Sequence, residues 1–175
     1  MIKKIAIVIA VLLAALLLFA TTKPDSFRVE RATSIKAPPE KIFSLINDLH
    51  NWTAWSPYEK KDPAMKRIHS GAVMGKGAAY GWEGNNDVGK GSMEIVNSSS
   101  PSKVTIKLDF VKPFETHNIV EFTLAPKGDS TNVTWAMQGP APFISKVMQV
   151  FIDMDDMVGK DFEAGLVNLK AAAEK

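Results

Sequence analysis

The sequence contains no cysteine among its 175 residues. Disulfide bonds, thiol catalysis and zinc sites with cysteine ligands are therefore excluded. A dense basic cluster is also missing. Of the 21 Lys and Arg residues, Lys3 and Lys4 lie near the N-terminus, and the other 19 are balanced by 19 acidic residues. Proteins bind nucleic-acid backbones through dense basic surfaces, so this composition indicates no nucleic-acid partner.

The motifs of several enzyme and cofactor classes are absent as well. No GxSxG element is present, which argues against a serine hydrolase of the nucleophile-elbow type. The glycines of residues 75–77 and 84–91 match no phosphate-binding pattern and suit hairpin turns. His50, His69 and His117 lie in separate segments without the spacing of metal ligands. We therefore expect no metal and no cofactor.

A long apolar run follows Lys3 and Lys4. Sixteen consecutive apolar residues extend from Ile5 to Ala20. With the two threonines that follow, the run makes about 27 Å of helix, close to the thickness of a bilayer core. We predict a signal anchor over residues 1–22 that crosses the membrane through residues 5–22. The two lysines favour a cytoplasmic N-terminus, which places the remaining chain on the periplasmic or extracytoplasmic side.

A cleaved signal peptide is the alternative for this segment, and it would make the protein secreted. Leu18-Phe19-Ala20 fits the small-residue pattern of a cleavage site poorly. Residues 23–26 are a short polar linker. Residues 27–175 then have the length and the apolar content of one domain with its own core.

The pattern changes twice within this domain. Residues 27–35 have the imperfect alternation of an edge strand, and a helix begins at Pro38-Pro39 and ends before Pro57. From residue 65 onward, apolar and polar residues alternate between turn sequences, as in residues 104–110. This predicts a meander of about six antiparallel strands with one apolar face.

One long amphipathic helix is predicted over residues 142–170, where it would cover the apolar face of the sheet. Its apolar face would carry residues spaced by three and four: Ile144, Met148, Phe151, Asp155, Val158, Phe162, Leu166 and Leu169. Gly159 and Gly165 interrupt this helix. Each costs about 1 kcal/mol relative to Ala, so we expect either a close approach of another group to the backbone or a slight bend there. Burial of Asp155 without a partner would raise its pKa.

Several stretches resemble the SRPBCC or START-like helix-grip superfamily, which includes polyketide cyclase/dehydrase-type proteins. These are Ile35-Lys36-Ala37-Pro38-Pro39-Glu40-Lys41-Ile42-Phe43, Asp48 through Trp52, Trp55 and Ser56-Pro57, Gly81-Trp82-Glu83-Gly84-Asn85, Gly91-Ser92-Met93-Glu94-Ile95 and Thr131-Asn132-Val133-Thr134-Trp135. The resemblance covers residues 27–175. It implies an α+β fold of the Bet v 1 type, in which a curved seven-stranded antiparallel sheet surrounds a long C-terminal helix. It also implies a hydrophobic cavity between them. Members bind lipids, sterols, polyketides or hormones, and some catalyse cyclisation or dehydration.

Aromatic residues from several segments are the strongest signal for a site. The ligand-binding candidates are Trp52, Trp55, Trp82, Phe110 and Trp135, with Met148 and Phe151 of the C-terminal helix. They either pack a filled core or line an apolar pocket. The candidates for a catalytic acid or base are Glu83 and Asp155. Strict alternation directs Glu83 away from the face of Trp82, unless a bulge re-aims it.

Three functional hypotheses remain. The first is a membrane-anchored domain that binds a hydrophobic small molecule or lipid without chemistry. The second is a polyketide cyclase/dehydrase-like enzyme, and the third is an envelope protein-interaction domain with a filled core. A cavity smaller than roughly 300 Å³ would exclude the first two. An enzyme also needs an ionisable group at the cavity. The oligomeric state is left open.

Overall fold

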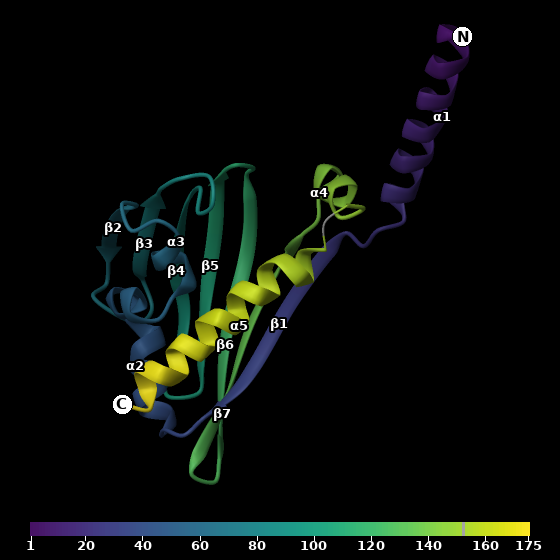
Figure 1. Ribbon diagram of the computed structural model, residues 1–175. Coiled ribbons are helices and arrows are strands. Elements are labelled where there is room, and N and C mark those ends of the chain that lie inside the picture. Colours follow the sequence, from purple (N-terminus) through teal and green to yellow (C-terminus); the bar gives the residue numbers. More distant parts are fainter. Residues whose placement is uncertain (152) are drawn as a thin grey trace.

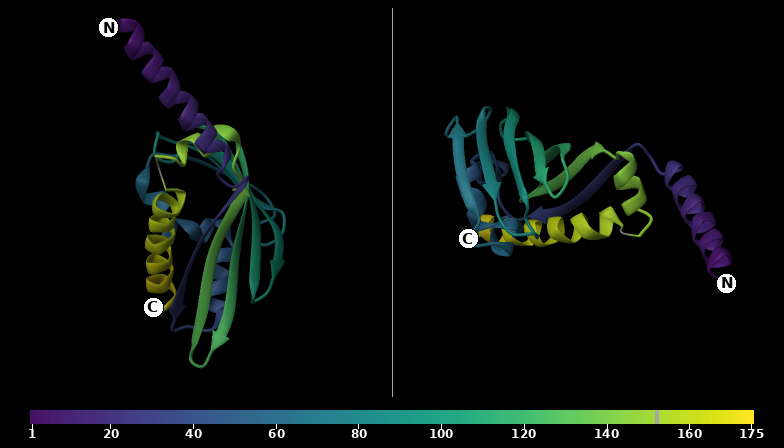
Figure 2. Two further views of the ribbon diagram at one scale, coloured as in Figure 1. Left: turned by 90° about the vertical axis from the view of Figure 1, so that its right-hand side faces the viewer. Right: turned by 90° about the horizontal axis from the view of Figure 1, so that it is seen from above.

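A curved sheet and the long helix on its concave side form the main body of the molecule (Figure 1). The computed structural model describes residues 1–151 and 153–175. A separate N-terminal helix, α1, projects away from this body (Figure 2). The α+β helix-grip fold is confirmed.

The sheet has seven antiparallel strands in the order β1-β7-β6-β5-β4-β3-β2. The first strand pairs with the last along its whole length, from Ser26 opposite Pro140 to Ile35 opposite Thr131. The other strands form the predicted meander, so β1 and β2 are the edges. The bounds are β1 Ser26–Ile35, β2 Lys66–Gly71, β3 Ala78–Glu83, β4 Lys90–Ser99, β5 Lys103–Lys112, β6 Thr116–Lys127 and β7 Ser130–Pro140.

Three short helices connect β1 to β2: α2 (Pro39–Asn47), the 3-10 helix η1 (Leu49–Ala54) and α3 (Pro57–Lys61). The indole N–H groups of Trp52 and Trp55 donate to the carbonyls of Ile46 and Leu45, which joins η1 to α2. The prediction that Pro57 ends the helical region is wrong. Pro57 begins α3, because proline has a fixed φ and no N–H, and both suit a first helical turn.

The single helix predicted over residues 142–170 is also wrong. The chain forms α4 (Phe143–Met148) and then α5 (Met154–Ala173), and the two differ in direction (Figure 1). Asp153 caps α5 by accepting a hydrogen bond of 2.8 Å from the backbone N–H of Asp155, so a new helix starts there. Ile144 and Phe151 are consequently exposed, away from the buried face of α5.

The buried face of α5 packs on the sheet through Phe162, Leu166 and Leu169. The ring of Phe162 stacks on Trp135 of β7 with 4.1 Å between the centroids. A Cβ atom at Gly165 would lie 2.6 Å from the same indole. The predicted close approach at this glycine is therefore confirmed, and it brings the helix and the sheet together at one end of the core.

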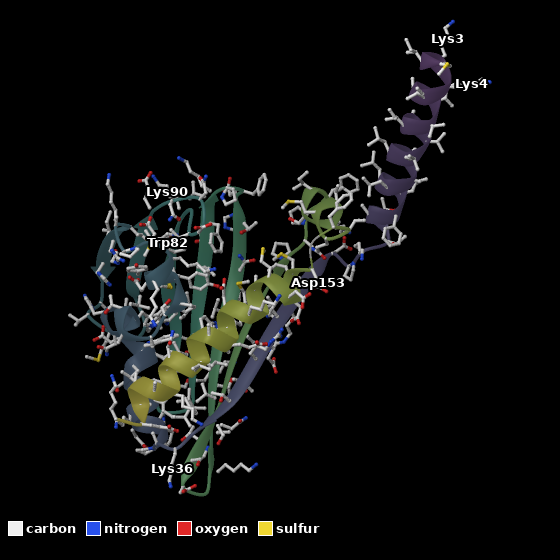
Figure 3. All side chains as sticks on the ribbon, in the orientation of Figure 1. Lys3, Lys4, Lys36, Trp82, Lys90 and Asp153 are labelled. Atoms are coloured by element: carbon white, nitrogen blue, oxygen red, sulfur yellow. The ribbon has the colours of Figure 1, made fainter. Side chains whose placement is uncertain are left out.

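Helix α1 (Ile2–Thr21) exposes nearly all of its apolar side chains. Its length and composition suit a membrane span, although a signal sequence near an N-terminus has the same properties. Ala20, near the end of α1, is buried, and α1 contacts α4. Lys3 and Lys4 lie at the end of α1 that is remote from the domain (Figure 3).

Candidate functional site: a cavity between the sheet and α5

A cavity of about 490 Å³ lies between the concave face of the sheet and the helices α3, α4 and α5. Inward-facing residues of β3 to β7 form one wall, among them Met93, Ile106, Leu108 and Val120. The opposite wall includes Val158 and Phe162 of α5. The volume falls within the range of roughly 300–1,000 Å³ that is typical of small-molecule pockets. The helix therefore does not fill the concave face of the sheet.

Five of the seven residues predicted to bind a ligand lie in the cavity wall: Trp52, Trp82, Phe110, Trp135 and Met148. Trp82 and Phe110 meet edge to face, with 5.5 Å between their centroids. The indole N–H of Trp82 donates to the carbonyl of Val88, which holds the ring beside the β3–β4 turn. These contacts give the wall rigid aromatic surfaces.

The other two predicted residues, Trp55 and Phe151, lie outside the wall. Trp55 is completely buried behind Trp52 and Trp135, at 4.8 and 5.6 Å between ring centroids. Phe151 follows α4 and is 73% exposed. Phe151 lies outside the wall because the continuous helix predicted for this region is instead two helices, α4 and α5, and Phe151 lies between them.

Neither catalytic candidate reaches the cavity. Glu83 is on the exposed side of β3 and pairs with Lys90 at 3.2 Å, and the hydrogen bond from Lys90 lowers the pKa of Glu83. Asp155 accepts hydrogen bonds of 2.9 and 2.8 Å from Arg31 of β1. These bonds lower the pKa of Asp155. Its side chain is 53% exposed and pairs with Arg31, so the expectation that Asp155 lies on the apolar face of the helix is wrong.

Other ionisable side chains do line the cavity. The carboxylate of Glu59 accepts a hydrogen bond of 2.7 Å from the Tyr80 hydroxyl and another of 2.7 Å from Nε of Arg67. Burial, followed by the bond to Glu59, raises the pKa of Tyr80 well above its usual range. Tyr80 therefore stays protonated and a hydrogen-bond donor at physiological pH. Glu59 is not predictable from the sequence, because a lone acid in a five-residue helix has no recognisable pattern.

Tyr58, Lys61 and Asp161 form a second group of polar side chains in the wall. Burial raises the pKa of the Tyr58 hydroxyl, and the nearby charge of Asp161 raises it further. Asp161 itself accepts a hydrogen bond of 2.7 Å from Lys61. Among the described residues, the Tyr58 hydroxyl has no hydrogen-bond partner, so it is free to bond to a ligand.

Asn118 contributes a buried amide to the wall. Its Nδ2 donates to the hydroxyl of Thr116 at 3.3 Å, whereas its Oδ1 lacks a partner among the described residues. The Asn118 side chain extends over Gly139, where a Cβ atom would lie 2.0 Å from Oδ1. Unpaired buried polar atoms cost about 1–3 kcal/mol, so a ligand that bonds to this amide would recover that energy. The sequence has a signal for this residue: Asn118 occupies an inward position of β6 between Thr116 and Val120.

The three histidines do not form a metal site. His50 and His69 come from different segments but stack with 4.1 Å between their rings. His117 pairs with Asp109 on the outside of the sheet. Across residues 1–151 and 153–175, no group of three or more His, Asp or Glu side chains is placed to hold a metal ion.

The fold and cavity agree with comparisons to known proteins. A family profile described as polyketide cyclase / dehydrase and lipid transport matches residues 26–174. The chain belongs to this family. Family membership and the apolar cavity together support a hydrophobic ligand-binding domain. No curated protein sequence matches the chain.

Several solved structures share the fold of this chain. The Aha1 dimer from Colwellia psychrerythraea is 16% identical, with a TM-score of 0.60 over 85% of this chain and 96% of that one. Major latex-like protein 151 from Panax ginseng is 15% identical, with a TM-score of 0.60 over 87% and 100%. Protein CV1439 from Chromobacterium violaceum is 15% identical, with a TM-score of 0.59 over 87% and 99%. At these identities the likeness shows the fold alone.

Proposed function

We propose that the protein is a membrane-anchored domain that binds a hydrophobic small molecule or lipid without chemistry. The observation that carries this proposal is the cavity of about 490 Å³ lined mainly by aromatic and aliphatic side chains. The family description, which includes lipid transport, supports it. A protein-interaction domain with a filled core is disfavoured, because the cavity exceeds roughly 300 Å³.

The side chains of the wall have two roles in this proposal. Trp52, Trp82, Phe110, Trp135 and Met148 supply apolar contact area, and methionine adapts its shape to the ligand. Asn118 and Tyr58 then orient a ligand that carries one or two polar groups. Helix α1 anchors the domain through residues 5–22 and places it on the periplasmic or extracytoplasmic side.

Purification of the full chain in a gentle detergent, followed by mass spectrometry of extracted apolar molecules, tests the proposal. Leu108→Trp adds bulk inside the cavity, and we expect it to reduce the amount of bound molecule per protein. Ile68→Trp is the matched control, because Ile68 lies on the edge strand β2 and is exposed. An empty wild-type protein, or equal loading of all three proteins, would contradict the proposal.

A cyclase/dehydrase-like enzyme is the second candidate, favoured by the hydroxyls of Tyr58 and Tyr80 and the Glu59 carboxylate in the wall. A protonated tyrosine can donate a hydrogen bond to an oxygen that gains charge during a reaction. The molecule recovered above would be incubated with wild type and with Tyr58→Phe and analysed by mass spectrometry. Conversion by wild type but not by Tyr58→Phe supports an enzyme. An unchanged molecule in both argues for binding alone.

A further inference from the structure

The segment from α4 to the start of α5 exposes an unusual number of apolar side chains. Phe143, Ile144 and Met148 of α4 are exposed, as are Phe151 and Met157. On the other side of the cavity, the β5–β6 turn exposes Phe114. We define these six residues as the apolar rim. Single exposed apolar residues are ordinary on protein surfaces, whereas such a group indicates an interaction site.

The apolar rim borders the cavity. Met148, Met157 and Phe114 are exposed and also belong to the cavity wall. They come from α4, α5 and the β5–β6 turn, so they approach the cavity from different sides. A ligand that enters or leaves between these elements would pass over apolar side chains.

The apolar rim is also continuous with the proposed anchor. Helix α1 contacts α4, and only residues 22–25 separate the end of α1 from β1. Four residues reach at most about 14 Å. Lys146 of α4 pairs with Asp25 of this linker, which holds α4 beside the anchor. The β5–β6 turn and α4 lie at the end of the sheet from which α1 departs (Figure 1).

We infer that the apolar rim inserts into the lipid bilayer beside α1, so that the cavity opens toward the membrane. The occupant is the boundary between headgroups and acyl chains, where amphipathic helices bury their apolar faces by about 5–10 Å. The ligand then exchanges directly between bilayer and cavity. This inference depends on the membrane anchoring proposed above.

Single cysteines test the insertion cleanly, because the chain has no cysteine of its own. The full chain with Ile144→Cys, Phe151→Cys or Phe114→Cys would be labelled with an environment-sensitive fluorophore. It would then be reconstituted into phosphatidylcholine vesicles with or without lipids that carry an acyl-chain spin label. Ile68→Cys and Val73→Cys are controls, since both positions are also apolar and exposed but lie on the edge strand β2 and in the turn that follows it.

We expect a blue shift of emission and quenching by the spin label at all three rim positions and neither effect at the controls. Quenching at Ile144 and Phe151 but not at Phe114 would overturn the membrane-facing cavity. The absence of quenching at all three rim positions would overturn the insertion. This holds also if the rim cysteines cross-link two copies, which would show that the apolar rim contacts a second copy instead of the lipid. Flotation of the vesicles distinguishes a rim that does not insert from an anchor that fails. An anchored protein floats with the lipid even if the rim stays outside the bilayer, whereas an unanchored protein does not.

Discussion

Arg31 of β1 lies directly over Gly159 of α5: a Cβ atom on Gly159 would come within 2.1 Å of Nη2 of Arg31. The guanidinium bonds to Asp155 at 2.9 and 2.8 Å and to Glu163 at 2.7 Å. One edge-strand residue therefore joins two carboxylates that flank the glycine on the helix. The missing side chain of Gly159 leaves the space in which Arg31 reaches both Asp155 and Glu163.

This relationship predicts the effect of Gly159→Ala. Alanine normally stabilises a helix interior by about 1 kcal/mol over glycine. Here we expect destabilisation of about 1–3 kcal/mol, because the new methyl group displaces Arg31 from its partners. In an Arg31→Ala background the same change should stabilise the protein. Thermal unfolding of the four proteins in detergent measures this cycle, and an identical effect in both backgrounds would contradict the account.

The Arg31 pair also predicts a dependence on acid. Hydrogen bonds from Arg31 lower the pKa of Asp155, so the folded state favours the carboxylate. Its contribution is complete above the unfolded pKa of about 3.9 and is lost as the pH falls through the lower folded value. We expect Asp155→Asn to lower the melting temperature slightly and equally between about pH 5 and pH 8, and the difference to shrink below about pH 4.

Asp156→Asn is the control for that experiment. It removes a carboxylate from the same helical turn, and Asp156 has no ion pair with Arg31 among the described residues. A difference of equal size for both variants would show that the charge at the helix start matters rather than the Arg31 pair.

The Glu59 network predicts a larger effect inside the cavity wall. Glu59→Ala would leave Nε of Arg67 and the hydroxyl of Tyr80 without their acceptor. We expect a loss of about 1–3 kcal/mol in unfolding free energy. Glu30→Ala breaks the exposed pair of Arg28 and Glu30 and should cost less than about 1 kcal/mol. Equal losses in chemical denaturation would refute the importance of the buried network.

Membrane topology is predicted by Lys3 and Lys4. Alkaline phosphatase fused after Lys175 should be active in a bacterial host, because the domain is expected outside the cytoplasm. The mass of the purified chain shows whether residues 1–22 are retained, as an anchor requires. A silent fusion would overturn the orientation, and a chain shortened at its N-terminus would overturn the anchor.

Much of the fold was predictable from local patterns. The alternation in residues 104–110 identified β5, because one side chain in two faces the core. Gly165 was correctly expected to mark a close approach, since glycine inside a helix is otherwise unfavourable. The break before α5 was missed, because apolar residues continue at helical spacing across Asp153. Only the cap formed by Asp153 shows that a new helix begins.

The site was predictable to a smaller extent. Trp82 and Trp135 are predictable as wall residues because they are aromatic and because the expected helix-grip fold brings their segments around one cavity. Asp155 was expected on the apolar face, because its spacing matches that of the buried residues in one continuous helix. In the structure it is exposed and pairs with Arg31. Its partner Arg31 is 124 positions away in the sequence. Glu59 and Tyr80 are likewise joined across the gap between α3 and β3, which no spacing rule reveals.

Composition and periodicity were thus sufficient for the α+β architecture, the apolar N-terminal helix and the absence of cysteine chemistry. They describe which residues are apolar and how often they recur, and both properties are local. The cavity volume, the contact between Arg31 and Gly159 and the apolar rim beside α1 depend on how distant segments pack. Only the tertiary structure, in which α4 and α5 pack against the sheet, therefore decides these features.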